Sequence, residues 1–402
     1  MGLSSLTRAV AAIAAVALTI TTSVNAIPTW PDSSSSTNRN FQCQNLTIPV
    51  TISARNAIFD VATPETNIEV TNFILNLAQQ GHNYSHTILK EYADVSGDYT
   101  LAATYCAPLN GNSKTLQILT HGVGFDRSYW DIPLNDFNYS YVASAVGEHG
   151  FSTLSWDRLG IGASTHGEPV NEIQATLEIA ALKELTRLAR AQQIPGLALP
   201  SFEKYVHVGH SFGSIQSFEL ARESPDLSDG LILTGFGLNG SFLPFFQFGG
   251  NWVSATSIPA LASQYAAGYF GAGNPSAVQT NFFSPGQFSA SALDLAAGAL
   301  GQPVTVGELL TIASAIGGVS QFSGPVLVIT GERDLPFCGG DCLATGDPAV
   351  ASIPAGVAAF VPSSRSYETF IVPKAGHGLN FEYSAQTTYQ HIARFLEANG
   401  FA

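Results

Sequence analysis

The stretch that decides the fold is YVHVGHSFGSIQSFELA, residues 205–221. It begins with a short apolar run that predicts a buried strand and ends in a segment that predicts a helix. Between them, Gly209, Ser211 and Gly213 form a Gly-x-Ser-x-Gly pattern, in which a sharp turn exposes the serine hydroxyl and small residues make room for the turn. The pattern is short enough to arise by chance, and its place between strand and helix gives it weight. Ser211 is therefore the candidate nucleophile.

A serine hydroxyl is a poor nucleophile at neutral pH, so it needs a base within hydrogen-bond reach and an acid that orients that base. Among the nine histidines, His377 is the candidate base, because it follows the last predicted core strand, 369–372, and precedes the last predicted helix, 384–399. An ordinary surface-loop histidine is the alternative. His207 and His210 flank the serine; we expect His207 to be buried and His210 to line the turn.

The orienting acid should follow a core strand and lie between the serine and the histidine in sequence. Asp334 meets both conditions, because the segment GERD, residues 331–334, follows the apolar run 325–330. Glu332 is the rival carboxylate in the same segment. The loop after the preceding strand, residues 235–238 (GFGL), contains no carboxylate. We therefore expect Asp334 to complete a Ser-His-Asp triad.

The oxyanion that forms during acyl transfer needs hydrogen-bond donors that are already in place. One donor is expected from the backbone N–H of Phe212, directly after Ser211. The other should come from HGVG, residues 121–124, which follows a predicted core strand. We expect the N–H of Val123 to be this donor, with Gly122 as the next choice. A plain glycine-rich turn is the alternative for this segment.

The rest of the chain alternates short apolar strands with helices, which indicates an α/β fold with a mostly parallel sheet covered on both faces. The strands are predicted at 115–120, 152–156, 205–208, 230–234, 325–330 and 369–372, and the helices at 171–193, directly after Ser211 and at 384–399. The core is thus expected in two parts, 115–234 and 322–402. Residues 27–114 form an N-terminal elaboration, with a helix that starts at Thr63 and strands at 87–92 and 98–106.

Residues 235–321 separate two consecutive core strands by far more chain than a crossover needs, so we expect an inserted cap or lid. Its only charged residues are Asp294 and Glu308. Its first half is crowded with aromatic residues, namely Phe236, Phe242, Phe245, Phe246, Phe248, Trp252, Tyr265, Tyr269, Phe270, Phe282, Phe283 and Phe288. Its second half, 289–320, has a helical period. These aromatic side chains form either an apolar surface above the serine or the cap's own core.

Five segments, in the right order, resemble the α/β-hydrolase superfamily in its serine-nucleophile branch. They are 119–122 (LTHG), 157–164 (DRLGIGAS), 209–213 (GHSFG), 331–334 (GERD) and 376–378 (GHG). The resemblance covers about 115–402, and the start of the chain is similar to secreted fungal members. It implies the α/β-hydrolase fold, with an inserted helical cap, and the triad Ser211, Asp334 and His377. Segment 157–164 is expected to shape the loop above the site rather than to take part in catalysis.

The first 26 residues have the order of a secretory signal peptide. Arg8 precedes an apolar run, 9–20, and the segment ends on small residues at Ala26, where we expect cleavage. A retained signal anchor is the alternative, for which the run is short. The Ser-rich stretch 27–40 is a predicted lead-in. We therefore expect a secreted protein with no stable membrane anchor.

An exported chain meets an oxidising compartment, so its four cysteines are expected to form disulfides. Of three possible pairings we favour Cys338 with Cys342 and Cys43 with Cys106, because the first pair encloses a short flexible loop. Further metal ligands are missing near these cysteines, and we expect neither a metal ion nor a cofactor. Four sequons mark candidate glycosylation sites, although several would arise by chance: Asn45, Asn83, Asn138 and Asn239.

A formal charge of -14 argues against nucleic acid as a partner, because phosphates would be repelled. We expect a hydrolase that cleaves small apolar carboxylic esters through an acyl-enzyme. A lactonase or a hydrolase that tailors secondary metabolites would have the same triad. Epoxide hydrolases and haloalkane dehalogenases need Asp at the place of Ser211, and aminopeptidase relatives need more acidic cap residues. A non-catalytic binding protein is the alternative from another class, and the oligomeric state stays open.

Overall fold

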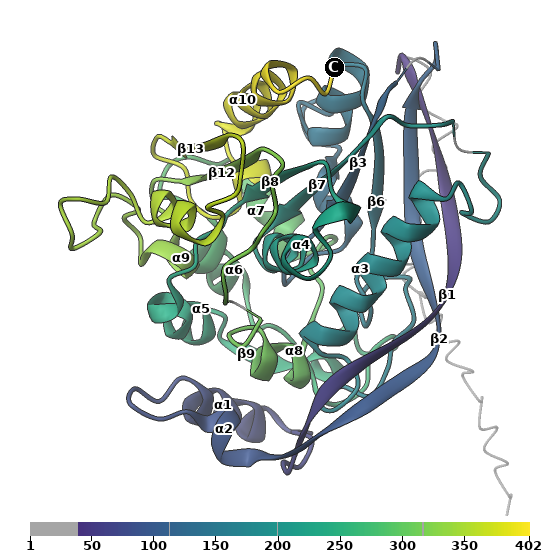
Figure 1. Cartoon of the computed structure of the whole chain (residues 1–402). Coiled ribbons are helices and arrows are strands. Elements are labelled where there is room, and N and C mark those ends of the chain that lie inside the picture. The colour runs from purple at the N-terminus through teal and green to yellow at the C-terminus, as the bar shows by residue number, and fades with distance from the viewer. Residues whose placement is uncertain (1–38, 112, 199, 316) are drawn as a thin grey trace, which may run out of the picture.

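The computed structural model describes residues 39–402 apart from 112, 199 and 316 (Figure 1). The predicted signal peptide and most of the predicted lead-in therefore lie outside the described residues. Across the part of the chain that is described, no helix combines the length and the apolar character needed to cross a membrane.

The core is one eight-stranded sheet with the order β1-β2-β6-β3-β7-β8-β12-β13. Its strands are β1 (Phe41–Phe59), β2 (Leu89–Pro108), β3 (Thr115–Thr120), β6 (Ser152–Trp156), β7 (Lys204–His210), β8 (Gly230–Thr234), β12 (Val326–Gly331) and β13 (Tyr367–Val372). Strands β6, β3, β7, β8, β12 and β13 are parallel, whereas β1 and β2 run antiparallel to their neighbours. The six predicted core strands are these parallel strands. Except for the edge strand β13, which is only partly buried, these strands are buried almost throughout, so the sequence reveals them directly as short, mainly apolar runs.

Helices cover both faces of the sheet. Helices α3 (Ala175–Arg190) and α4 (Phe212–Glu223) pack against each other on one face, and η2 (Ala143–Glu148) and α10 (Ala385–Ala398) lie on the other (Figure 1). Helix α3 begins four residues after its predicted start, because the side chains of Asn171 and Gln174 bond the backbone of β1 instead of entering the helix. The predicted last helix agrees with α10 to within one residue at each end.

The N-terminal elaboration differs from its prediction. Strand β1 was not predicted, and β2 is one continuous strand rather than two; residues 84–88 form helix α2 (Tyr84–Ile88). The two long strands pair along their whole length and form the curved edge of the molecule in Figure 1. Much of β2 is only partly buried, so it lacks the apolar pattern that identifies a strand. Helix α1 (Asn67–Leu77) is capped by Thr66, which forms a capping box with Glu69, and not by Thr63.

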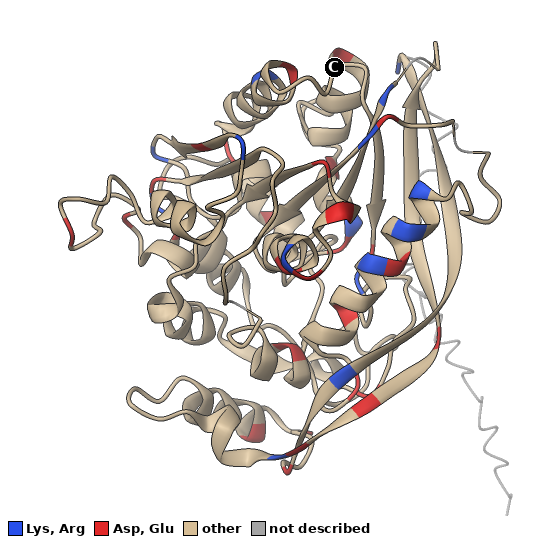
Figure 2. Cartoon of the chain, in the orientation of Figure 1, with Lys and Arg blue, Asp and Glu red and all other residues tan. Residues whose placement is uncertain are grey.

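The segment 235–321, called the cap from here on after its prediction, lies between β8 and β12 and is not purely helical. It contains helices α5 (Leu243–Gly249), α6 (Pro275–Phe282), α7 (Ala290–Ala297) and α8 (Val306–Thr311), together with a small sheet of β9 (Trp252–Ser254), β10 (Tyr269–Ala272) and β11 (Val304–Thr305). Of the twelve aromatic residues noted in the sequence, eight are buried. Most of the cap aromatics therefore pack the interior of the protein. Figure 2 shows how few charges this region carries.

The remaining elements are short. They are α9 (Leu335–Cys338), β4 (Asp131–Ile132), β5 (Tyr139–Ser140), η1 (Arg127–Trp130), η3 (Pro225–Leu227), η4 (Gly240–Phe242), η5 (Ala255–Ser257), η6 (Pro354–Phe360) and η7 (Leu379–Phe381). Among them, η1, α9 and η7 lie closest in sequence to the predicted site residues.

Both expected disulfides are present. Cys43 is joined to Cys106 across the β1–β2 ladder, where the two residues are direct partners, and Cys338 is joined to Cys342 at the end of α9. The first bridge closes a loop with a sequence separation of 63 and the second one of 4. The second bridge follows Asp334 by four residues, so it restrains the segment that carries the predicted acid.

We expect the double variant C43S/C106S to lose about 4 kcal/mol of unfolding free energy, because a long loop in the unfolded chain is no longer closed. The matched variant C338S/C342S should lose about 2 kcal/mol, since its loop is short. Urea denaturation of both variants measures the difference. A larger loss for C338S/C342S would contradict the loop-entropy argument.

Candidate active site

Ser211 occupies the sharp turn between β7 and α4. Its backbone adopts φ 55° and ψ -118°, a conformation that L residues rarely take. Such a conformation persists only where the surrounding structure holds it in place. A Cβ atom on Gly209 would lie 2.4 Å from the carbonyl oxygen of Gly213, and one on Gly213 would lie 2.1 Å from that of Thr120. The two glycines of the motif are therefore needed for the turn to approach β3. The turn leaves Ser211 9% exposed.

Asp334 and His377 form a buried pair, as the triad hypothesis requires. His377 Nδ1 lies 2.7 Å from Asp334 Oδ2, and Asp334 also accepts hydrogen bonds from the Thr330 hydroxyl at 2.6 Å and the Phe337 N–H at 2.9 Å. Because the carboxylate is an acceptor, His377 carries its proton on Nδ1 and has a free lone pair on Nε2. Nε2 is buried and has no hydrogen-bond partner among the described residues.

Glu332, the rival acid, has a different role. Its Oε2 accepts the Lys374 N–H at 2.8 Å, and the side chain is half-buried at the surface end of the loop. Only Asp334 of the two carboxylates contacts His377. The geometry thus favours Asp334 as the orienting acid.

The loops after β7, β12 and β13 meet at one edge of the sheet, because the carboxyl ends of parallel strands share an edge. There the ring of His210, the neighbour of Ser211, lies 4.8 Å from the ring of His377 between centroids. No hydrogen bond joins Ser211 Oγ to His377 Nε2 in the part of the chain described. Such bonds are often long in a ligand-free enzyme and shorten when substrate binds.

The glycine-rich segment 121–124 lies directly against the serine. A Cβ atom on Gly122 would be 2.8 Å from Ser211 Cβ, so only glycine allows this approach. Neither the Val123 N–H nor the Phe212 N–H has an acceptor among the described residues. Two buried, unpaired amides beside a nucleophile are what an oxyanion hole provides.

His207 and His210 lie where the sequence predicted them, and both are fully buried. His210 stacks on Tyr129 of η1 at 4.4 Å and contacts the Thr234 hydroxyl at 3.1 Å. Since Thr234 donates its own proton to Gly209, His210 donates through Nδ1, and its Nε2 is left as an unpaired acceptor. Burial lowers the pKa of His210 well below its usual value, so the ring beside the nucleophile is neutral.

The cap contacts the loop that carries His377. The ring of Phe282 lies 5.7 Å from that of His377, and its carbonyl accepts the Gly378 N–H at 2.6 Å. Glu382, in the same loop, accepts the Ser284 N–H at 2.5 Å with one carboxylate oxygen and the Gly376 N–H at 2.7 Å with the other. Glu382 thus joins the cap to the histidine loop.

Burial raises the pKa of Glu382 from about 4.5 to about 7, against the lowering effect of the two N–H donors. A carboxyl group with such a pKa titrates near neutral pH. It therefore changes charge under ordinary assay conditions, at a point where the cap meets the catalytic loop.

Comparison with known proteins bears on the identity of this site. The family profile described as the alpha/beta hydrolase family matches residues 117–388, which include the serine elbow, Asp334 and His377. The chain belongs to the alpha/beta hydrolase family. A search of the curated proteins finds no match to this hydrolase.

Several solved structures are similar to this alpha/beta hydrolase. An esterase from Thermogutta terrifontis is 18% identical, with 75% of this chain and 94% of that chain covered and a TM-score of 0.53. An alpha/beta hydrolase fold protein from Chitinophaga pinensis is 17% identical (75% and 94% covered, TM-score 0.48), and a monoacylglycerol lipase from Paleococcus ferrophilus is 14% identical (71% and 95% covered, TM-score 0.46). At 18% identity, the likeness to the Thermogutta terrifontis esterase shows the fold alone.

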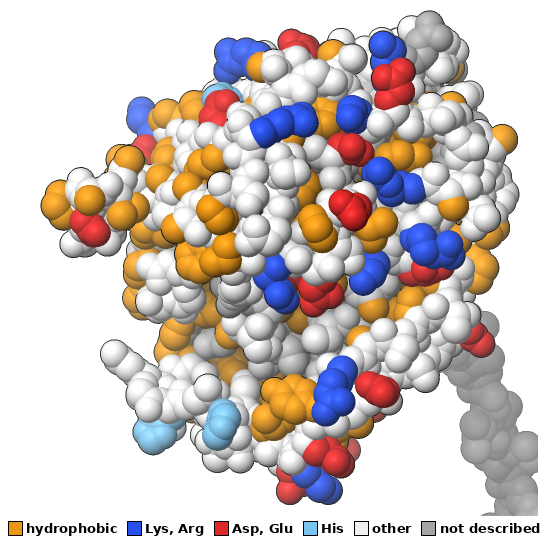
Figure 3. Space-filling view, in the orientation of Figure 1, with side chains coloured by type: hydrophobic (Ala, Val, Ile, Leu, Met, Phe, Trp, Pro, Cys, Tyr) orange, Lys and Arg blue, Asp and Glu red, His pale blue; other side chains and the backbone are white. Residues whose placement is uncertain are grey.

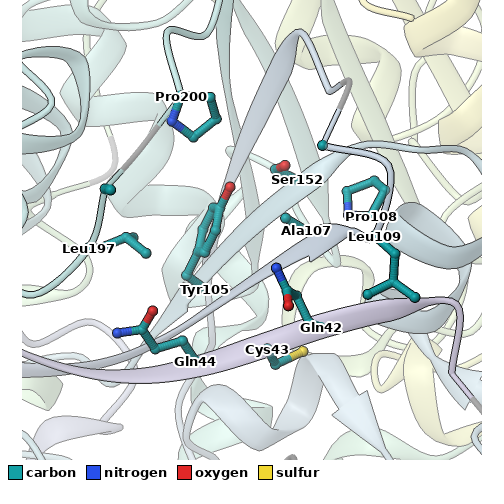
Figure 4. Close-up of a pocket in the computed structure, with 12 residues that line it drawn as sticks. Gln42, Cys43, Gln44, Tyr105, Ala107, Pro108, Leu109, Ser152, Leu197 and Pro200 are labelled. Atoms are coloured by element: carbon teal, nitrogen blue, oxygen red, sulfur yellow. The ribbon is translucent and has the colours of Figure 1, made fainter.

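One cavity of this hydrolase lies away from the candidate triad. It has a volume of about 600 Å³ and is lined in part by Gln42, Gln44, Tyr105 and Ser152 (Figure 4). Ser152 begins β6, so the cavity is at the amino ends of the parallel strands, whereas Ser211 follows the carboxyl end of β7. Within the described residues, no group of three His, Cys, Asp or Glu side chains is arranged to hold a metal ion.

Sequence reasoning missed three groups at the candidate hydrolase site, namely Thr330, Glu382 and Tyr129, and it noted Phe282 only as one of the cap aromatics. Thr330 was within reach, because it ends the strand before Asp334. Glu382 carries a weaker signal, as a carboxylate five residues after the predicted base. Tyr129 and Phe282 come from η1 and from the cap, and no local pattern links them to the triad.

The pKa of Glu382 predicts how the stability of this hydrolase depends on pH. Between pH 4.5 and 7 the folded protein holds a proton on Glu382 that the unfolded chain has released, so raising the pH lowers the free energy of unfolding. The full effect is on the order of 3 kcal/mol. Urea denaturation from pH 5 to 8 should show this decline in the wild type and not in E382Q, which cannot titrate. Equal slopes in the two proteins would contradict the assignment.

Proposed function

We propose that this protein hydrolyses carboxylic esters of apolar substrates through an acyl-enzyme formed on Ser211. The observation that carries the proposal is the buried pair of His377 and Asp334. The Nε2 of His377 is without a partner among the described residues, and it lies at the same edge of the sheet as the Ser211 turn. This arrangement activates a serine for attack on a carbonyl carbon. Membership of the hydrolase family supports the same reaction class.

In the first step, Ser211 Oγ attacks the ester carbonyl carbon while His377 Nε2 takes the hydroxyl proton. The N–H groups of Phe212 and Val123 bind the oxyanion that forms, and Asp334 stabilises the resulting imidazolium. His377 then gives the proton to the leaving alkoxide, the carbon–oxygen bond breaks and an alcohol departs. Water, activated by the same histidine, attacks the acyl-enzyme, and the carboxylic acid and free Ser211 result.

Two features support an apolar substrate: the aromatic rings around His377 and the exposed phenylalanines of the cap. Phe282 and Phe337 lie 5.7 and 5.8 Å from the ring of His377, so rings border the catalytic base. On α5 of the cap, Phe245 and Phe248 are each 50% exposed. Figure 3 shows hydrophobic side chains gathered on this face over the region of α5 and α9. A nearly uncharged cap gives a polar or anionic substrate few partners.

Secretion and glycosylation belong to the same proposal. Two disulfides are typical of proteins that leave the reducing cytosol, and the start of the chain has the order of a signal peptide similar to that of secreted fungal members. Of the four sequon residues, Asn45, Asn83 and Asn138 are exposed and Asn239 is half-exposed. All four side chains can therefore be reached by a modifying enzyme, although Asn83 and Asn239 also cap short helices.

The triad is tested by the variants S211A, H377A and D334N. Each single change should lower kcat on a p-nitrophenyl ester by several orders of magnitude, and S211A/H377A should lose little more than S211A, because the groups act as a unit. A fluorophosphonate should form one covalent adduct on Ser211 of the folded wild type and none on S211A. E332Q is the matched control and should retain activity. A wild type that forms no adduct would rule out the serine mechanism.

The substrate class is tested by p-nitrophenyl esters of increasing acyl length, with lactones and peptide amides in the same panel. We expect kcat/KM to rise from short to medium acyl chains, because the rings around His377 favour apolar groups. F282A should shift this preference by removing one ring beside the base, whereas F270A, a change in the buried cap sheet, should alter stability without shifting it. Highest activity on short polar esters would contradict the apolar assignment, and turnover of lactones alone would reassign the enzyme as a lactonase.

A further inference from the structure

Arg158 is a fully buried cation that the reaction steps above do not use. It follows β6, and its Nη1 donates to two carboxylates from different parts of the molecule: Glu178 of α3, at 2.5 Å, and Glu308 of the cap helix α8. All three side chains are 0% exposed. Burying three ionisable groups costs more free energy than burying hydrophobic residues of similar size. Stability alone therefore does not explain the cluster.

The other contacts of Arg158 lead to the segment that carries the predicted oxyanion donor. Its backbone N–H donates to His121 Nε2 at 3.0 Å, which requires a lone pair on that nitrogen. The His121 proton is therefore on Nδ1, which donates to the Gly122 carbonyl at 2.8 Å. Arg158 Nη2 donates to the same carbonyl at 3.3 Å. The Gly122 oxygen is thus held by two donors: the His121 ring, which the backbone N–H of Arg158 orients, and the Arg158 guanidinium itself.

The Gly122 carbonyl and the Val123 N–H belong to one planar peptide unit. Fixing the oxygen therefore fixes the direction of the N–H on the opposite side, and this peptide lies against Ser211. The guanidinium of Arg158 also lies 4.8 Å from the centre of the Phe212 ring, so it contacts both the Gly122–Val123 peptide, through the Gly122 carbonyl, and the side chain of Phe212. An oxyanion donor stabilises the transition state only if it already points at the developing charge.

Glu308 ties this arrangement to the cap. It is one of two charged residues in 235–321, and the other, Asp294, is exposed on α7. One Glu308 oxygen accepts the Thr305 N–H at 2.7 Å, within a capping box that starts α8, and the other accepts from Arg158. The position of Arg158 is thus linked to how α8 is seated on the core.

We propose that Arg158 is a positioning residue that orients the Gly122–Val123 peptide for oxyanion binding, and that Glu308 couples this orientation to the seating of the cap. The inference rests on the proposed function, because it concerns the oxyanion of that reaction. In this inference Glu308, the buried charged residue of the cap, affects catalysis without contacting the substrate.

The test compares R158K and E308Q with D294N, a matched change of acid to amide at the exposed cap position. R158K keeps the charge but loses the forked geometry that reaches two carboxylates and a carbonyl together. For the p-nitrophenyl ester that the wild type cleaves best, we expect kcat to fall about 10- to 100-fold in R158K and about 3- to 10-fold in E308Q, less than the loss of a whole donor. KM should stay within about threefold, since misalignment affects mainly the transition state. D294N should match the wild type.

Affinity for a trifluoromethyl ketone with the same acyl chain separates positioning from folding. This probe forms a tetrahedral adduct whose oxyanion uses the same donors, so its affinity should fall by the same factor as kcat in R158K and in E308Q. Urea denaturation of each variant measures its stability separately. If R158K does not fold, E308Q alone still tests the inference.

The outcomes are distinct. Variants that lose stability while kcat and ketone affinity stay within twofold of the wild type would overturn the inference and leave the esterase proposal in place. A wild type that forms no fluorophosphonate adduct would overturn the proposed function and this inference with it.

Discussion

The close approach between the β7–α4 turn and β3 is the constraint on which the site depends. A side chain at Gly213 would lie 2.1 Å from the Thr120 carbonyl, so the turn can close only with glycine there. The same approach forces Ser211 into a positive φ and points the start of α4 at the segment after β3. One steric condition thus brings the nucleophile, the Phe212 amide and the glycine-rich segment 121–124 together.

Around this turn, the interior holds few charges, and each is placed by specific partners. Charged residues make up only 11% of the chain. Asp334 accepts three hydrogen bonds, Glu382 accepts two backbone N–H groups, and Arg158 meets two carboxylates. A buried charge without such partners would cost several kcal/mol. These groups therefore act as fixed points that tie separate segments to the catalytic edge of the sheet.

The cap combines two roles that its composition alone does not separate. Most of its aromatic side chains fill its own interior and its contact with the core, while Phe282 reaches the histidine and two phenylalanines of α5 remain exposed. Its polar contacts with the core are spread over several elements, and they include the Glu382 bond to Ser284, the Glu308 bond to Arg158 and the Tyr269 hydroxyl bond to the Gly167 carbonyl. The cap is therefore fixed to the core by apolar packing and by hydrogen bonds at several points.

The sequence by itself determined the parallel strands and the turn at Ser211, because each is written in a short run of residues. It also favoured, among three possible cysteine pairings, the one that the structure shows. Buried strands such as β3 and β8 are continuous apolar runs, and Gly-x-Ser-x-Gly needs only five residues. Only the tertiary structure decided the β1–β2 pairing, the small sheet in the cap, and the partners of Glu382 and Arg158. Glu382 bonds a residue 98 positions away, and Arg158 one 150 positions away. Such contacts arise from how distant segments pack, and no local pattern records them.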